Sequence, residues 1–291
     1  NLIGSFASFL MIIPSIRGAR LAIDRRLLKA VLLFSIPLFL GGLAGISNDL
    51  LDRFFIEALL PDAIKWEELG IYTAATKVTA LMVIFTQMYR YAAEPMFLAK
   101  FKNDDFKIAN AEVMTFFVLA SIAIFLGVTL YIGLFKYIVA EEFRGAMSLV
   151  PVMLVSAGLM GIFLNLNFWY KYVEKTYFAI IITVSGLIVS VLLDLWFIPL
   201  WGIDGAAYAK LASMFFMVAL SFYFNQKYYP IPYKIGRMLE YTGLAAIIFV
   251  IAKYMNIKNC WIDYSVRSLL FLIFIGYAIK RERILLLLKQ K

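Results

Sequence analysis

The sequence predicts an all-α, polytopic transmembrane helix bundle, and three observations predict it. Of the 291 residues, 63% are hydrophobic and only 16% are charged, and the mean hydropathy is +0.85. Apolar segments long enough to cross a bilayer recur along the chain, and the loops between them are alternately basic and acidic. A water-soluble domain carries about a quarter charged residues, so the composition alone favours a membrane protein.

About eight full spans and one short N-terminal span are expected. A helix needs about 20 apolar residues to cross the hydrocarbon core. The first apolar run, 2–16, is shorter and is interpreted as the end of a truncated helix. The full spans are expected at 30–54, 69–98, 111–135, 146–170, 177–199, 202–224, 238–255 and 262–279. The loops between them are short, and none is long enough for a soluble catalytic domain.

The positive charges indicate an orientation in the membrane. Of the 28 Lys and Arg residues, 18 fall in loops on one side of the expected bundle, and 5 fall in loops on the other side. Because basic loops favour the cytoplasmic side, the C-terminus is expected in the cytoplasm. The net charge of +9 then faces anionic membrane lipid, and no nucleic-acid partner is expected.

Missing residue types exclude several chemistries. The sequence has no His and one Cys, Cys260, so it has no Ser-His-Asp triad, no His or Cys zinc site and no disulfide framework. No GxxxxGK[ST] motif is present, so ATP is not bound through a P-loop in this chain. We expect no enzyme activity, metal or cofactor, and any transport is secondary or downhill.

The segment 69–98 has a polar side along its whole length. At 100° per residue, one arc of the helix carries Thr73, Thr76, Lys77, Gln87, Arg90, Tyr91 and Glu94. A charge within a span costs at least about 2.5 kcal/mol, so each needs a partner or a wet cavity. The candidates for binding an anionic substrate are Lys77, Arg90, Gln87 and Tyr91, with Arg53 of the preceding span. Alternatively, the stripe joins helices, with Arg90 and Glu94 neutralising each other four residues apart.

Other charged residues are candidates for ion pairs or gates. Asp49 and Arg53 are four residues apart at the end of the span 30–54 and are favoured as a pair. Asp194 and Lys210 lie at similar depth across a tight turn and are expected to form a structural pair. The full set of ion-pair or gate candidates is Asp49, Asp52, Glu94, Asp194 and Lys210.

Four segments give the sequence a resemblance to a known family. They are 47–55 (SNDLLDRFF), 69–77 beginning Leu-Gly-Ile-Tyr, 87–95 (QMYRYAAEP) and 193–207 (LDLWFIPLWGIDGAA). Together they resemble the bacterial polysaccharide flippases of the O-antigen type. That family belongs to the superfamily that also contains multidrug and toxin extrusion transporters and the lipid II flippase. Family members commonly have Asn in place of Asp194 and a small polar residue near Lys210.

The resemblance implies a division of the chain and a function. It implies the end of a truncated helix with a basic cytoplasmic linker at 1–29, a six-helix C-terminal bundle at 30–225 and a helix pair at 226–291. The implied function is flipping of an undecaprenyl-diphosphate-linked oligosaccharide from the inner to the outer leaflet of the bacterial cytoplasmic membrane by alternating access. Polysaccharide polymerase machinery is a further partner that it suggests.

Other functions remain open at this point. An ion-coupled multidrug exporter of the same superfamily would use acids such as Asp49, Asp52 or Glu94, although Lys77 and Arg90 do not suit a cationic drug. A lipid II flippase would share the class of lipid-linked substrate. A membrane glycan polymerase or glycosyltransferase would need a sizeable loop with catalytic acids, which the short loops oppose. A purely structural membrane scaffold explains an intramembrane Lys77 poorly.

Overall fold

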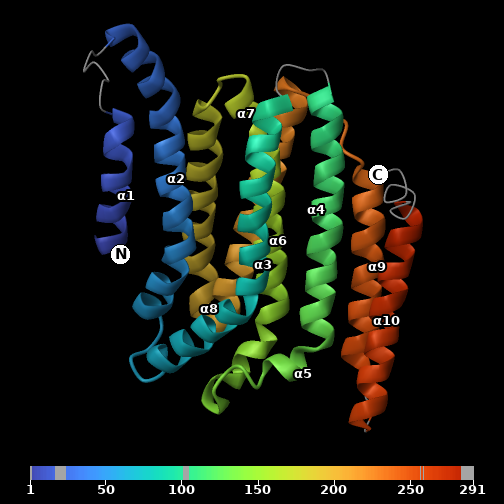
Figure 1. Cartoon of the computed structure of the whole chain (residues 1–291). Helices are drawn as coiled ribbons and strands as arrows, with labels where there is room; N and C mark the ends of the chain where they lie inside the picture. Colours follow the sequence, from blue (N-terminus) through green and yellow to red (C-terminus); the bar gives the residue numbers. More distant parts are fainter. Residues whose placement is uncertain (1, 17–23, 101–104, 256, 258, 283–291) are drawn as a thin grey trace. The chain divides into compact units, whose positions relative to one another are not determined.

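The computed structural model describes residues 2–16, 24–100, 105–255, 257 and 259–282. These residues form helices joined by short connections, without a strand, as the composition predicts. The elements, labelled in Figure 1, are α1 (Leu2–Ile16), α2 (Arg25–Leu59), α3 (Lys65–Lys100), α4 (Asp105–Leu130), α5 (Ile132–Phe135), the 3₁₀ helix η1 (Glu141–Ser148), α6 (Val150–Leu166), α7 (Phe168–Tyr172), α8 (Tyr177–Tyr228), α9 (Ile235–Tyr254) and α10 (Cys260–Arg281).

The chain divides into two compact units, Asn1–Ile36 and Pro37–Lys291. The first unit contains α1 and the first turns of α2, and nearly all of its described side chains are exposed. The second unit contains the rest of α2 and all later elements. Every residue of the candidate site belongs to the second unit.

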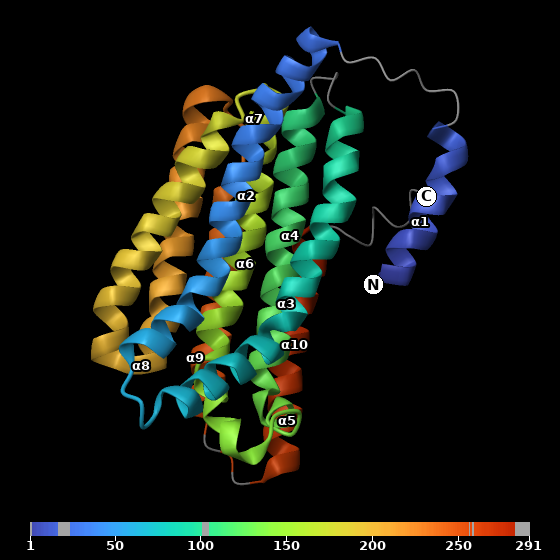
Figure 2. The same cartoon turned by 90° about the vertical axis from the view of Figure 1, so that its left-hand side faces the viewer.

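Seven helices of the described part are long and apolar enough to cross a membrane. Helix α8 supplies two such lengths, because Gly202 interrupts it at φ 60° and ψ −135° and the chain reverses there (Figure 2). The eight expected full spans therefore correspond to α2, α3, α4, α6, the two halves of α8, α9 and α10. A shorter apolar helix, Gly4–Pro14, matches the short N-terminal span. The chain is a multi-pass membrane protein.

The boundaries around α5 and α6 differ from the expectation. The expected span 111–135 is α4, which ends at Leu130, followed by the short helix α5. The expected span 146–170 begins later, because residues 141–148 form η1 and α6 starts at Val150 with Pro151 in its first turn. Proline suits this position because the first amides of a helix have no helical acceptor.

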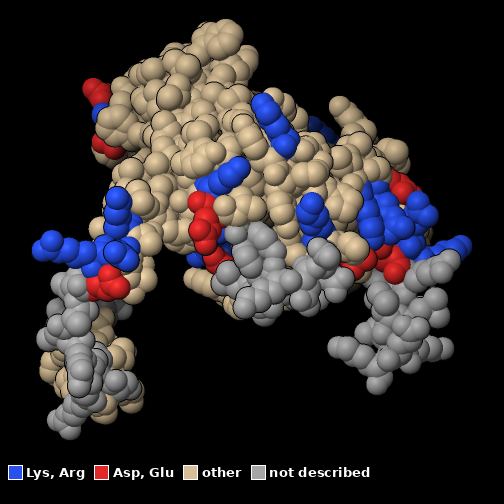
Figure 3. Space-filling view, turned by 90° about the horizontal axis from the view of Figure 1, so that it is seen from above, with Lys and Arg blue, Asp and Glu red and all other residues tan. Residues whose placement is uncertain are grey.

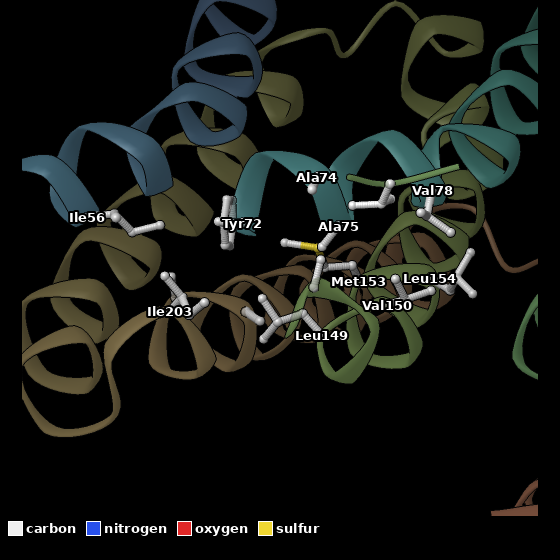
Figure 4. Close-up of a cluster of buried hydrophobic side chains, with 14 of the residues drawn as sticks. Ile56, Tyr72, Ala74, Ala75, Val78, Leu149, Val150, Met153, Leu154 and Ile203 are labelled. Atoms are coloured by element: carbon white, nitrogen blue, oxygen red, sulfur yellow. The ribbon is translucent and has the colours of Figure 1, made fainter. Parts of the chain in front are cut away.

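Helix α6 is the central helix of the second unit, where it contacts α3, α4 and α8. In the largest buried cluster, side chains of α3 meet side chains of α6 (Figure 4). Ile56 of α2 and Ile203 of α8 lie beside Tyr72 at one end of this cluster (Figure 4). Tyr72 and Ile56 are 2% and 0% exposed, so side chains at the end of α2 contribute to this cluster.

The α9–α10 pair packs against α4 through a separate buried cluster that includes Leu126, Tyr241 and Phe274. Arg267 of α10 joins all three helices. Its guanidinium donates to the carbonyl oxygens of Leu130 at 3.1 Å and Ala252 at 3.3 Å, and to Asp263 at 2.8 Å. Carbonyls in the last turn of a helix have no helical donor, so Arg267 satisfies the C-terminal ends of α4 and α9.

Next to the reversal, the two halves of α8 approach each other through backbone. A Cβ atom placed on Gly205 would lie 2.2 Å from the carbonyl oxygen of Phe197, on the other side of the reversal. Real Cβ atoms do not approach a backbone oxygen this closely. The hairpin therefore requires glycine at 205 for packing and glycine at 202 for its positive φ.

We expect Gly205→Ala to lower the free energy of unfolding by about 1 to 3 kcal/mol, because the added methyl group forces the hairpin apart. Gly243→Ala in α9 is the matched control, since a Cβ at Gly243 meets nothing within 4 Å and alanine is the better helix former. Thermal unfolding in detergent measures both variants. Equal unfolding temperatures for the two would contradict this account of the hairpin.

Candidate functional site

A cavity of about 250 Å³ lies between α2, α3, α6 and α8 within the second unit. Its wall is part polar and part apolar. It is lined by Asp52 and Arg53 of α2, Tyr72, Thr76, Thr79, Val83, Thr86 and Gln87 of α3, Met153, Ser156, Ala157 and Met160 of α6, and Lys210 and Met214 of α8. The elements that line it are membrane-spanning or directly adjoin a span.

Helix α3 supplies most of the polar wall. Thr76 and Thr79 donate their hydroxyl protons to carbonyl oxygens of their own helix, at 2.7 and 2.9 Å. Thr86 donates across the cavity wall to the carbonyl oxygen of Ala157 in α6, at 3.5 Å. The threonine hydroxyls can therefore line a cavity inside an apolar bundle without unpaired donors, and their lone pairs remain available to a ligand or water.

Asp52 forms a buried ion pair in the cavity wall. Its Oδ2 atom lies 2.8 Å from Lys210 Nζ and accepts a hydrogen bond of 2.7 Å from the hydroxyl of Tyr72. The Asp52 side chain is 1% exposed and that of Lys210 is 20% exposed. A buried carboxylate requires such a counter-charge and donor, so this contact joins α2, α3 and α8.

Asp194 lies next to this ion pair and is completely buried. Its Oδ2 atom accepts a hydrogen bond of 3.4 Å from Ser190, and it lies within electrostatic range of Asp52 and Lys210. The sequence predicts an ion pair between Asp194 and Lys210. In the structure the ammonium group of Lys210 contacts Asp52. Asp52 Oδ1 and Asp194 Oδ1 have no hydrogen-bond donor among the residues that the structure describes.

Arg53 extends along the cavity wall from α2 to α3. Its Nη2 atom lies 3.4 Å from the hydroxyl oxygen of Thr76, and the guanidinium is exposed. The sequence favours a pair between Arg53 and Asp49. The side chain of Asp49 lies outside the described residues, so that pair stays a prediction.

The remaining candidates on α3 have different surroundings. Gln87 lines the cavity, whereas Lys77 is exposed on α3 and is not part of the cavity wall. The guanidinium of Arg90 lies 5.3 Å from the ring centroid of Tyr91, which is 62% exposed. Glu94 forms its ion pair with Lys171 of α7, at 2.7 Å. Glu94, which could neutralise Arg90 within α3, is thus paired with a lysine of α7 instead.

A buried polar network lies between α3, α4, α6 and the connection that follows α8. Asn165 of α6 donates to the hydroxyl of Tyr89, and Tyr233 donates to Asn110 of α4 at 3.2 Å. Burial and the nearby Tyr89 raise the pKa of Tyr233 above its usual value, so its phenol stays protonated as a donor. The sequence does not indicate these partners, because they come from four separate elements.

A metal centre has no support in the described residues. No group of three or more Asp, Glu, Cys or His side chains comes together there.

The fold of the chain is also found in solved structures of membrane transporters. Three solved structures have this fold: an outward-facing multidrug resistance MATE family transporter of the MOP superfamily (TM-score 0.53, 18% identity), a MOP superfamily transporter from Pyrococcus furiosus with a binding pocket of reverse polarity (0.52, 17%), and the lipid II flippase MurJ in an inward-closed conformation (0.57, 16%). No protein-family model and no curated protein matches the sequence.

Each match covers a larger share of this chain than of the solved structure. The matches cover 78%, 78% and 97% of this chain, but only 54%, 54% and 61% of the three solved chains, in the same order. The chain thus spans little more than half the length of the transporters that it matches. It has the fold of MOP superfamily transporters, over a part of their length.

We expect Lys210→Met to lower the free energy of unfolding by about 3 to 5 kcal/mol, because Asp52 then stays buried without its counter-charge. Asp52→Asn combined with Lys210→Met is expected to be less destabilised than Lys210→Met alone. Unfolding of the detergent-solubilised chain measures this double-mutant cycle, with Lys253→Met as a control for an exposed lysine. Purely additive effects of the two substitutions would show that the contact contributes nothing.

Proposed function

We propose that the chain is part of a transporter that flips an undecaprenyl-diphosphate-linked oligosaccharide from the inner to the outer leaflet. The observation that carries this proposal is the cavity, whose wall has the exposed cation Arg53 beside the Asp52–Lys210 ion pair. Ammonium and guanidinium groups bind phosphate through charged hydrogen bonds. The neutral polar groups of α3 suit the hydroxyls of a sugar.

The arrangement of the charges supports an anionic rather than a cationic substrate. The carboxylates near the cavity are engaged, because Asp52 is paired with Lys210 and Glu94 with Lys171. Lys77 is exposed, and it forms no ion pair with a described carboxylate. The accessible charge around α3 is therefore positive. Lys77, Arg90 and Arg53 are our candidates for contact with the diphosphate, and Gln87 and Tyr91 for contact with the glycan.

The transport step follows from the division of the chain that we propose. Residues 30–225 form a six-helix bundle and 226–291 a helix pair, and rocking of such a bundle switches the side to which the cavity opens. The polyprenyl tail stays in the lipid during this movement. With the C-terminus in the cytoplasm of a bacterial inner membrane, the inside-negative potential favours outward movement of the diphosphate by about 2.3 kcal/mol per charge per 100 mV.

A second candidate is an ion-coupled multidrug exporter. One observation favours it: Asp52 and Asp194 are buried close to each other, and each has an oxygen without a donor among the described residues. Coupling would then depend on these acids. A lipid II flippase is a variant of the first proposal, since its substrate is also lipid-linked.

The experiment that tests the proposal uses cells that lack the gene encoding the chain. Lipid-linked glycan is expected to accumulate in the inner leaflet, where a membrane-impermeant sugar probe does not reach it. Normal exposure of glycan on the outer leaflet, together with increased drug sensitivity, would reject the flippase and favour the exporter.

We expect Arg53→Gln and Lys77→Ala to lower the rate of glycan export about tenfold or more at unchanged protein level, because each removes a charged hydrogen bond to phosphate. The sugar probe measures export, and immunoblotting measures protein level. Lys253→Ala at the end of α9 is the matched control and should export normally. Normal export by both test variants would remove these residues from the binding site.

A further inference from the structure

Two lysines, neither of them ion-paired with a carboxylate of the described residues, lie near one tyrosine ring at the end of the molecule where α7 lies. Lys175 Nζ is 5.4 Å from the ring centroid of Tyr228, and Lys227 Nζ is 5.6 Å from the same centroid. Lys175 lies in the turn before α8, and Lys227 lies in its last turn. The reversal of α8 at Gly202 brings these two ends together. Figure 3 views the molecule from this end and shows separate groups of basic side chains, several with acidic side chains beside them, on a surface that is otherwise uncharged.

The Tyr228 ring packs against two buried aromatic side chains. Tyr228 is 44% exposed and is stacked on the buried Trp169, with the ring centroids 6.3 Å apart and the planes at 11°. Phe178 packs against it at 5.0 Å. The two ammonium groups thus lie near one ring that is packed against buried aromatic side chains.

The charge at this place is not neutralised by the described residues. Neither Lys175 nor Lys227 forms an ion pair with a described carboxylate. At the opposite end, near α5, Tyr137 also holds two cations, Lys136 at 5.1 Å and Arg144 at 5.8 Å. There Arg144 is paired with Glu141 at 2.7 Å. The Tyr228 site is therefore the more strongly positive of these two, and it suits an anion.

An exposed apolar stripe continues from the lysines along the first half of α8. It begins at Tyr177, two residues after Lys175, and follows the helix at intervals of three or four residues. Its members are Tyr177, Ile181, Val184, Ile188, Leu192 and Leu195, which are 36% to 61% exposed. This half of α8 is membrane-spanning, so the stripe suits an acyl chain. Inorganic phosphate would use the lysines alone, whereas a phospholipid would use both parts.

We propose that Lys175 and Lys227, held on the ring of Tyr228, bind the headgroup of an anionic phospholipid whose acyl chain lies along this stripe of α8. The site is separate from the transport cavity, and the proposal does not depend on the proposed function. Basic sites at the ends of membrane-spanning helices bind anionic headgroups, and each lysine near the membrane surface contributes about 1 kcal/mol.

The test measures retention of lipid by the purified full chain in neutral detergent. Native mass spectrometry compares phosphatidylglycerol with phosphatidylcholine of the same acyl chains. We expect the wild-type chain to prefer phosphatidylglycerol, and Lys175→Gln and Lys227→Gln each to weaken its binding about fivefold. The double Lys→Arg variant is expected to keep the preference. Lys136→Gln, at the opposite end, is the matched control and should bind as wild type.

Three outcomes would overturn the proposal. They are equal retention of the two lipids by the wild-type chain, undiminished phosphatidylglycerol binding by the double Lys→Gln variant, and displacement of the lipid by millimolar inorganic phosphate, which would identify a phosphate site. If the double Lys→Gln variant fails to fold, the salt dependence of lipid binding is measured with the wild-type chain instead. A preference that falls as salt rises supports a charged headgroup site, and a preference independent of salt contradicts it.

Discussion

The reversal of α8 at Gly202 is the constraint on which the rest of the site depends. Glycine readily adopts the positive φ that position 202 requires. At position 205 the backbone of Phe197 leaves no room for a side chain. This turn returns the second half of α8 along the first, so that Lys210 lies in the same buried layer as Asp194 and Asp52. The same return brings Lys227 beside Lys175 at the other end of the hairpin. One backbone turn thus generates both charged features of α8.

Desolvation decides which charges of the spans remain accessible. Each buried acid of the described part has a compensating donor: Asp52 has Lys210 and Tyr72, and Asp194 has Ser190. Arg267 is likewise compensated by Asp263 and two helix ends. Lys77, in contrast, is exposed on α3. Because neutralised charges contribute little to the field in a cavity, the accessible cations set the sign of the charge that a substrate meets.

The helices could be predicted from the sequence because their signals are local. Apolar length marks each span, and the glycine-containing turn between the expected spans 177–199 and 202–224 is where α8 reverses. The charge partners could not be predicted, because they depend on which helices become neighbours. Lys210, predicted as the partner of Asp194, lies within electrostatic range of it and also forms an ion pair with Asp52 of α2, which is distant in sequence. Two acceptors of Arg267 are backbone carbonyls, which the sequence does not distinguish from other carbonyls.

The cavity is large enough for the diphosphate of the proposed substrate but not for its oligosaccharide. Its volume of about 250 Å³ is below the range of about 300 to 1,000 Å³ that encloses a drug-sized ligand. A diphosphate is small enough for it, and Arg53 and Lys210 lie in its wall, whereas an oligosaccharide is too large. Under the proposed function the glycan would therefore extend beyond the cavity, toward Tyr91 on the exposed side of α3.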